Sequence, residues 1–148
     1  MASEGTSALQ PGHRTLPEGS PAAEVSTSTS APAVPPVLDA ERLHCYRLAL
    51  DLQVLCGTLA PMTHRVIQDQ LERASLSVVC NIAEGAGRRS RKDKRRMYAI
   101  ARGSATETAA IVDVLRLRRL APEGACSSAR LLALRVVQLL TKLDAALA

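Results

Sequence analysis

Apolar side chains recur at intervals of three and four residues from Leu38 to the end of the chain, and this spacing restricts the fold more than any other feature. It places them along one face of an α-helix, whereas the strict alternation of a half-buried strand does not occur. The pattern predicts four helices, over residues 39–58, 63–84, 90–119 and 127–146. Because short segments connect them, we expect an all-α fold, an antiparallel up-down four-helix bundle domain spanning residues 38–148.

Residues 1–37 have a different composition, rich in Ser, Thr, Pro, Ala and Gly and nearly without large apolar side chains. Such a segment buries too little apolar surface to offset the entropy lost on ordering, which predicts a disordered tail. Residues 1–30 lack the charged and then apolar pattern of a secretory signal, and no apolar run reaches membrane-spanning length. We therefore expect a cytoplasmic protein that does not contact a membrane.

The first predicted helix carries two apolar stripes on nearly opposite faces. One stripe consists of Leu43, Tyr46, Leu50 and Val54, and the other of Cys45, Leu48, Leu52, Leu55, Cys56 and Leu59. A bundle core covers only one of them, so the other indicates a protein partner, most simply a second copy of the chain. A misjudged helix phase is the alternative.

Local signals place the helix ends. Asp39 is expected as the N-cap of the first helix, and Gly85 is expected to end the second helix in a left-handed conformation. Ser90 followed by Asp93 is a capping-box pattern that starts the third helix.

The second predicted helix has a regular apolar stripe and a polar row beside it. The stripe consists of Ile67, Leu71, Ala74, Val78 and Ile82, and the row consists of Gln70, Arg73, Ser77, Asn81 and Glu84. Such a row is either solvated or part of a hydrogen-bond network between helices.

Seven of the nine residues from Arg88 to Arg96 are basic, at the predicted start of the third helix. The helix dipole disfavours cations there, by roughly 0.3–1 kcal/mol each at exposed sites. A bound anion would explain this placement, because free backbone N–H groups and guanidinium forks would then meet the same phosphate. The alternative is a solvated surface that confers solubility. The predicted nucleic-acid contacts are Arg88, Arg89, Arg91, Lys92, Arg95, Arg96 and Arg102.

Charge and aromatic content narrow the kind of partner. Residues 38–148 hold 18 Lys and Arg against 11 Asp and Glu, a net charge of +7, which favours RNA or DNA. Tyr46 and Tyr98 are the only residues of the Phe, Trp and Tyr class, so we expect phosphate contacts without sequence specificity and not recognition by base stacking. The four cysteines and three histidines show no metal-ligand spacing, which predicts no metal and no cofactor, with the cysteines as small buried hydrophobes.

The chain resembles the four-helix-bundle protein family whose members are often encoded within intervening sequences of bacterial 23S rRNA genes. The resemblance covers most of residues 38–145, apart from the connection 60–65 and the long tail. The matching motif and interface positions are Gln70, Arg73, Asn81, Glu84, Gly85, Gly87, Ser90, Tyr98, Ser104 and Glu107. The family is also similar to the accessory variability determinant of diversity-generating retroelements. The resemblance implies a ring-like homo-oligomer, typically a pentamer, without established enzymatic activity, and with nucleic acid and a reverse transcriptase as candidate partners.

Three classes of function remain open. The preferred hypothesis is a non-enzymatic, oligomeric nucleic-acid-binding accessory protein, and the second is an oligomeric scaffold whose basic face binds an acidic protein. An enzyme would require a carboxylate site, for which Glu84, Asp93 and Glu107 are the candidates, but no nucleophile–base pair accompanies them. We therefore predict no catalytic residues, and expect Glu84 to pair with an Arg of the basic run or with Asn81.

Overall fold

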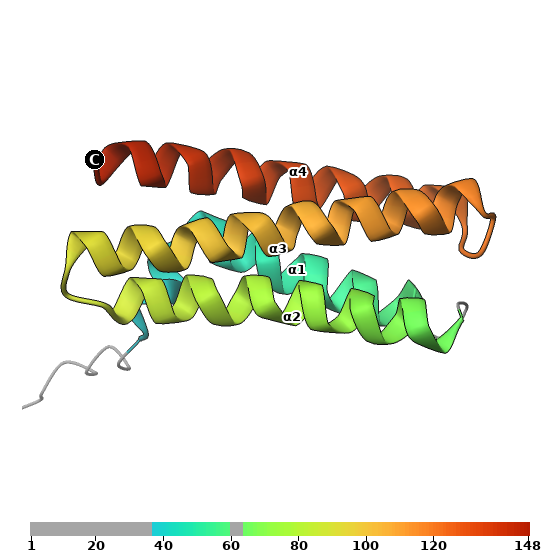
Figure 1. Ribbon diagram of the computed structural model, residues 1–148, viewed down its shortest axis with the longest axis horizontal. Helices are drawn as coiled ribbons and strands as arrows, with labels where there is room; N and C mark the ends of the chain where they lie inside the picture. The colour runs from blue at the N-terminus through green and yellow to red at the C-terminus, as the bar shows by residue number, and fades with distance from the viewer. Residues whose placement is uncertain (1–36, 60–63) are drawn as a thin grey trace, which may run out of the picture. The chain divides into compact units, whose positions relative to one another are not determined.

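The computed structural model describes residues 37–59 and 64–148, which form a short 3-10 helix and four α-helices (Figure 1). These elements are η1 (Asp39–Arg42), α1 (His44–Leu59), α2 (Arg65–Gly87), α3 (Arg91–Leu117) and α4 (Glu123–Ala146). No strand occurs among the described residues, so the predicted all-α class is confirmed. The tail predicted over residues 1–37 lies outside the described residues, except for Val37.

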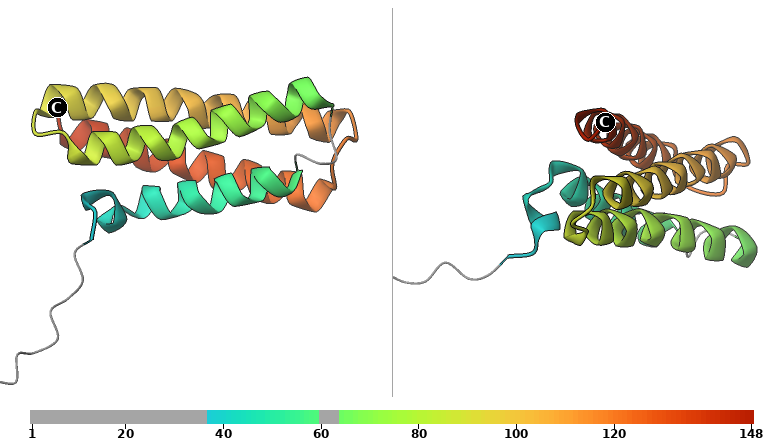
Figure 2. Two further views of the ribbon diagram at one scale, coloured as in Figure 1. Left: turned by 90° about the horizontal axis from the view of Figure 1, so that it is seen from below. Right: turned by 60° about the vertical axis from the view of Figure 1, so that its left-hand side comes forward.

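The four α-helices pack in cyclic order, each against two neighbours. α1 packs on α2, α2 on α3, α3 on α4, and α4 on α1, whereas the backbones of the diagonal pairs stay apart and only their side chains meet in the core (Figure 2). Successive helices run antiparallel, as expected for an up-down bundle. The α2–α3 turn, η1 and the end of α4 consequently lie at one end, and the α3–α4 turn lies at the other.

The core consists of two clusters stacked along the bundle. The cluster nearer the α2–α3 turn contains Cys45, Leu48, Ala49, Val78, Ile82, Tyr98, Ala101, Ala105, Val136 and Leu140. The other cluster contains Leu52, Cys56, Leu59, Leu71, Val112, Leu115, Cys126, Ala129 and Ala133. Burying each Leu, Ile or Val side chain stabilises the fold by about 1.5–3 kcal/mol, and the many Ala and Cys residues let the helices approach closely.

The start of the first helix differs from the prediction. Asp39 begins the 3-10 helix η1, and Leu43 is extended, with φ −88° and ψ 123°, before α1 starts at His44. The 3-10 turn buries Ala40, and η1 packs against α2 as well as α1. The prediction that Asp39 caps one continuous helix was therefore wrong, because a tertiary contact of η1 overrides the local helix signal.

The two stripes of α1 have different roles. Cys45, Leu48, Leu52, Cys56 and Leu59 are buried in the core, with Leu55 packed beside them. In the other stripe Leu43 and Tyr46 are partly buried, but Leu50 and Val54 are 41% and 66% exposed. The first stripe thus faces the core, whereas the second is divided, because Leu43 and Tyr46 pack partly against the core and Leu50 and Val54 face outward. A protein partner on these two exposed side chains stays a prediction.

Gly85 does not end α2, contrary to the sequence-based expectation. The helix continues to Gly87, and Arg88 leaves it with φ −71° and ψ 143°. Gly85 is instead a buried helical residue, and a Cβ atom built there would lie 2.6 Å from Cε1 of Tyr98. Its function is to admit the Tyr98 ring, a distant contact that the local pattern does not encode.

α4 begins four residues earlier than predicted, at Glu123, because Pro122 provides the N-cap position. The extra turn brings Cys126 into the core, followed by Ala129 and Ala133. Because Ala and Cys are only weakly hydrophobic, they contribute little to the apolar period, and the sequence pattern therefore predicted a later start of α4.

The C-terminus of α3 is closed by a Schellman motif. The N–H of Leu120 donates to the carbonyl of Leu115 at 2.9 Å, and that of Arg119 donates to the carbonyl of Arg116 at 3.0 Å. Arg119 adopts φ 56°, a left-handed conformation that costs a residue with Cβ about 1–2 kcal/mol. A cation at a helix C-terminus regains about 0.3–1 kcal/mol, an effect that Arg116 supplies without this strain.

Three of the four cysteines are buried, as expected, but Cys80 is exposed on α2, so the prediction was wrong for this residue. Burial raises the pKa of Cys56 to about 12, and the hydrogen bond with Ser75 opposes that shift. Cys80 lies on the outer side of α2, away from the stripe that contains Val78 and Ile82.

Candidate nucleic-acid interface

The basic run lies on the turn between α2 and α3 and on the first two turns of α3. Ser90 caps α3, because its hydroxyl oxygen accepts a hydrogen bond from the backbone N–H of Asp93 at 3.4 Å. This confirms the predicted start of the helix. The turn before it, Arg88–Ser90, is only three residues long, so the cations of the turn and the helix gather at one end of the bundle.

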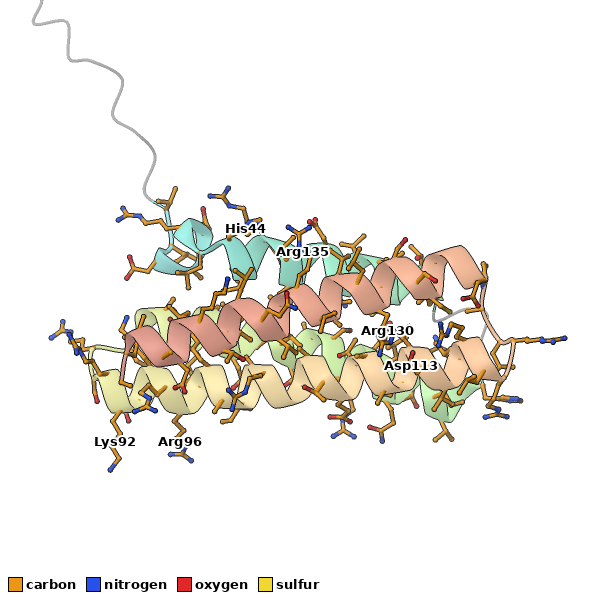
Figure 3. All side chains as sticks on the ribbon, turned by 90° about the horizontal axis from the view of Figure 1, so that it is seen from above. His44, Lys92, Arg96, Asp113, Arg130 and Arg135 are labelled. Carbon is orange, nitrogen blue, oxygen red and sulfur yellow. The ribbon has the colours of Figure 1, made fainter. Side chains whose placement is uncertain are left out.

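Most of the predicted cations are exposed and available. Lys92 and Arg96, one helical turn apart, both point away from the bundle (Figure 3). Among the described residues, no ion pair forms at Arg89, Arg91, Lys92, Arg96 or Arg102. Arg102 is partly buried, and the other four are exposed.

Two predicted contact residues are already paired with carboxylates. Arg88 forms an ion pair with Glu84, one turn earlier in α2. Nε of Arg95 donates to Oδ1 of Asp144 at 2.9 Å, which joins the start of α3 to the end of α4. These two guanidinium groups are less available to an anion than their neighbours.

The pairing changes the titration of these groups. The hydrogen bond from Arg95, followed by the charges of Arg95 and Arg102, holds the pKa of Asp144 below its ordinary value. The hydrogen bonds from Arg88 to Glu84 and from Arg95 to Asp144 raise the pKa of each guanidinium. Asp144, Arg88 and Arg95 are therefore all charged near neutral pH.

Lys94 has a structural contact, and the sequence-based set of contacts did not include it. Its ammonium group donates to the carbonyl of Ala86 at 2.9 Å, near the C-terminus of α2. A cation is favourable at this position, because the last carbonyls of a helix lack internal partners. One residue of the run therefore stabilises the turn that presents the others.

The α2–α3 end remains strongly basic after these pairs are counted. The seven cations of the run and Arg102 make eight, against the carboxylates of Glu84, Asp93 and Asp144, an excess of five positive charges. Arg91, Lys92, Arg95 and Arg96 line one shallow open hollow between the start of α3 and the end of α4. An anion in this hollow would meet several cations at once.

The polar row of α2 forms a network with α3. The hydroxyl groups of Ser77 and Ser104 are 2.9 Å apart, and Nδ2 of Asn81 donates to the carbonyl and hydroxyl oxygens of Ser77 at 2.8 and 3.1 Å. A shallow groove beside this network is lined in part by Gln70, Arg73 and Glu107, all exposed.

The remaining motif positions have separate surroundings. Gly85 contacts Tyr98 in the core, whereas a Cβ atom at Gly87 would meet nothing within 4 Å. The predicted motif residues thus divide between the core, the α2–α3 groove and the basic turn.

The carboxylates considered for an enzymatic site do not form one cluster. Glu84 pairs with Arg88, Asp93 lies in the first turn of α3, and Glu107 lines the α2–α3 groove. Within residues 37–59 and 64–148, no three His, Cys, Asp or Glu side chains gather closely enough to hold a metal ion. In the same part of the chain, no helix is long and apolar enough to cross a membrane.

The expectation that Glu84 pairs with an Arg of the basic run is confirmed by its ion pair with Arg88. Glu84 in α2 and Arg88 directly after it are four residues apart, which is the ordinary spacing of such a pair at a helix. Arg95 and Asp144 are 49 residues apart and meet only because α3 and α4 pack side by side, so no local signal predicts their contact.

Comparison with known proteins agrees with the fold. One similar solved structure is a protein of unknown function from the S23 ribosomal protein family of Bacteroides thetaiotaomicron, with a TM-score of 0.65 and 21% sequence identity. The match covers 68% of this chain and 97% of that chain, and at this identity it supports the fold alone. No curated protein matches the chain.

A family model provides the assignment. It matches residues 41–142, more than half of the chain, and describes the 23S rRNA-intervening sequence protein. The matches do not test the predicted relation to the retroelement determinant, which stays a prediction. The chain belongs to the 23S rRNA-intervening sequence protein family.

Proposed function

We propose that this protein is a non-enzymatic, oligomeric accessory protein of the cytoplasm that binds RNA or DNA through the α2–α3 end of its bundle. Arg89, Arg91, Lys92 and Arg96 bind phosphate oxygens, and Arg102 extends the contact along α3. Arg88 and Arg95 also bind phosphate when it replaces their carboxylate partners, Glu84 and Asp144. The name of the family, which refers to 23S rRNA, makes structured RNA the first ligand to test.

The observation that carries this proposal is the exposed, unpaired cation cluster at the N-terminal end of α3. Four of its members lack a carboxylate partner among the described residues, although the helix dipole disfavours them there. A bound phosphate would offset this unfavourable interaction, because it pairs with the cations and accepts hydrogen bonds from the first N–H groups of α3. With few aromatic side chains, recognition depends on phosphates and therefore on salt.

Salt dependence and a paired substitution test the proposal. Lys92→Ala with Arg96→Ala removes two exposed cations and should lower the slope of log affinity against log salt by about 1.8 on duplex DNA. Arg135→Ala is the control, because Arg135 is exposed on α4 and lies far from Lys92 and Arg96 (Figure 3). Fluorescence anisotropy with nuclease-treated protein and 20-base-pair RNA and DNA measures both effects. A wild-type affinity that does not respond to salt would contradict the proposal.

A protein scaffold is the second candidate function. The exposed stripe of Leu50 and Val54 on α1 favours it, because exposed apolar side chains in a row suit contact with another helix. In this case the basic end binds an acidic protein surface. Recovery of the same protein partner before and after nuclease treatment would favour the scaffold, whereas loss of the bound material would favour nucleic acid.

A further inference from the structure

The end of the bundle opposite the α2–α3 turn also presents free cations. Arg118 and Arg119 follow α3 directly, and both are exposed. In the described part of the chain neither forms an ion pair, whereas their neighbour Arg116 lies 3.7 Å from both Asp113 and Glu123. Arg130 is likewise occupied, with its Nε 2.8 Å from Asp113 (Figure 3).

The carboxylates at this end therefore neutralise a different set of cations. Asp113 forms ion pairs with Arg116 and Arg130, and Glu123 forms one with Arg116. Neither carboxylate pairs with Arg118 or Arg119. Arg65, in the first turn of α2, is a third exposed cation at the same end and has no ion pair among the described residues. As in the basic run, a cation in the first turn of a helix lies at the positive end of the helix dipole, which is unfavourable.

Arg119 occupies a position that suits glycine better. It closes the Schellman motif of α3 with φ 56°, where a residue without Cβ would avoid strain. Favourable interaction with the helix dipole does not explain it, because Arg116 is already in the last turn of α3. Strain that the fold does not require is a reason to look for a function of the side chain.

The outer surface of α3 between the two basic ends does not continue the positive charge. After Arg96, the outward positions include Ile100, Val114 and Leu117, which are 42%, 43% and 77% exposed. The exposed charged residue between them is the acidic Glu107, whereas Arg102 is partly buried near the α2–α3 end and Asp113 and Arg116 pair with each other. A duplex lying along α3 would place its phosphates against apolar and acidic side chains, so each basic end is better suited to a separate segment.

The distance between the ends permits two segments. α3 contains 27 residues, which corresponds to a length of about 40 Å. This is about twice the diameter of a nucleic-acid duplex (~20 Å, from the groove dimensions of B-DNA), so two duplexes bound at opposite ends would not collide.

We propose that Arg118 and Arg119, with Arg65 at the same end, form a second phosphate-binding surface, so that one bundle bridges two nucleic-acid segments. This inference rests on the proposed function, because it requires the α2–α3 end to bind the first segment. Phosphates of the second segment contact the free guanidinium groups beyond α3, and no base is read.

A bridging assay tests this inference. One 20-base-pair RNA duplex is attached to beads, a second fluorescent copy is free, and the protein is added at moderate salt. Wild-type protein should retain the fluorescent duplex. Arg118→Ala with Arg119→Gly should lower retention roughly tenfold while anisotropy of one duplex in dilute solution changes less than about twofold. A parallel arm with DNA of the same sequence compares the two polymers.

Two further variants separate charge from folding. Arg119→Gly alone relieves the strained backbone and should raise the melting temperature, so its loss of bridging cannot come from unfolding. Arg119→Lys retains the charge and the strain and should preserve bridging. Undiminished bridging by the double variant overturns this inference alone, since oligomers would then bridge through their α2–α3 ends. Failure of wild-type protein to bind a single duplex overturns the proposed function as well.

Discussion

At the scale of single residues, small side chains determine how closely α2 and α3 approach. Gly85 leaves space for the Tyr98 ring, and Ser77 reaches Ser104 directly across the helix pair. Ala101 and Ala105 are fully buried on α3 and continue this close packing. The α2–α3 turn is therefore held by contacts on the core side, while its outer side is free to carry cations.

Gly85→Ala should destabilise the protein. The added Cβ would lie 2.6 Å from Cε1 and 2.9 Å from Cδ1 of the buried Tyr98 ring, and 3.1 Å from Cβ of Met97. Overpacking of this kind costs about 1–3 kcal/mol, which exceeds the gain of up to about 1 kcal/mol in helix propensity. Thermal unfolding followed by circular dichroism should show a lower melting temperature.

Gly103→Ala is the matched control for this prediction. Gly103 is exposed within α3, and a Cβ atom there would meet nothing within 4 Å. The same chemical change should therefore raise stability, by up to about 1 kcal/mol. Equal effects of the two substitutions would show that Tyr98 does not require a glycine at position 85.

At the scale of elements, the start of α3 combines stabilising contacts with an excess of charge. Ser90 caps the helix, and Lys94 donates to the carbonyl of Ala86 at the end of α2. Arg95 holds Asp144 near the end of α4. The contacts fix three helix ends relative to one another, and the remaining cations are presented on a rigid frame, which lowers the entropy cost of binding an anion.

Asp144→Asn tests the link between α3 and α4 through pH. The pKa of Asp144 is lowered in the folded protein, so its contribution to stability is present above its unfolded pKa and is lost as pH falls through the folded value. The substitution should lower the melting temperature near neutral pH. The difference from wild type should disappear once the pH falls below the folded pKa, where the carboxyl group is protonated in both states.

Asp144→Asn should lower stability but raise the affinity for RNA. It frees Arg95 for a phosphate and removes one negative charge from the hollow, so the affinity for an RNA duplex should rise. A melting difference that persists in acid would show that Asp144 acts through packing and not through its charge. Weaker RNA binding by Asp144→Asn would place the ligand away from the hollow.

At the scale of the whole molecule, the sequence predicts the number, order and type of helices because each helix has its own apolar period. It also predicts the capped start of α3, since Ser90 and Asp93 are three residues apart. The structure adds what depends on distant neighbours: the role of Gly85 facing Tyr98, the pair Arg95–Asp144, and the break between η1 and α1. Local patterns cannot contain these contacts, because α3 and α4, or η1 and α2, meet only after folding.

The outer face of α1 is the expected assembly interface of the molecule. Leu50 and Val54 form an exposed apolar stripe along α1, next to Leu43 and Tyr46, which pack partly against the core. We expect this stripe to bind a second copy of the chain, because burial of each side chain would contribute about 1.5–3 kcal/mol. Light scattering of nuclease-treated protein should give the mass of at least two chains of 15.7 kDa each.

Leu50→Ser with Val54→Ser should reduce that mass to a single chain without unfolding the bundle, since neither side chain belongs to the core clusters. Leu117→Ser is the control, because Leu117 is 77% exposed but lies on α3. Loss of assembly should also weaken RNA binding by at least roughly a hundredfold, because linked basic ends bind multivalently. A wild-type mass of one chain would remove the stripe as an interface and leave each bundle to bind alone.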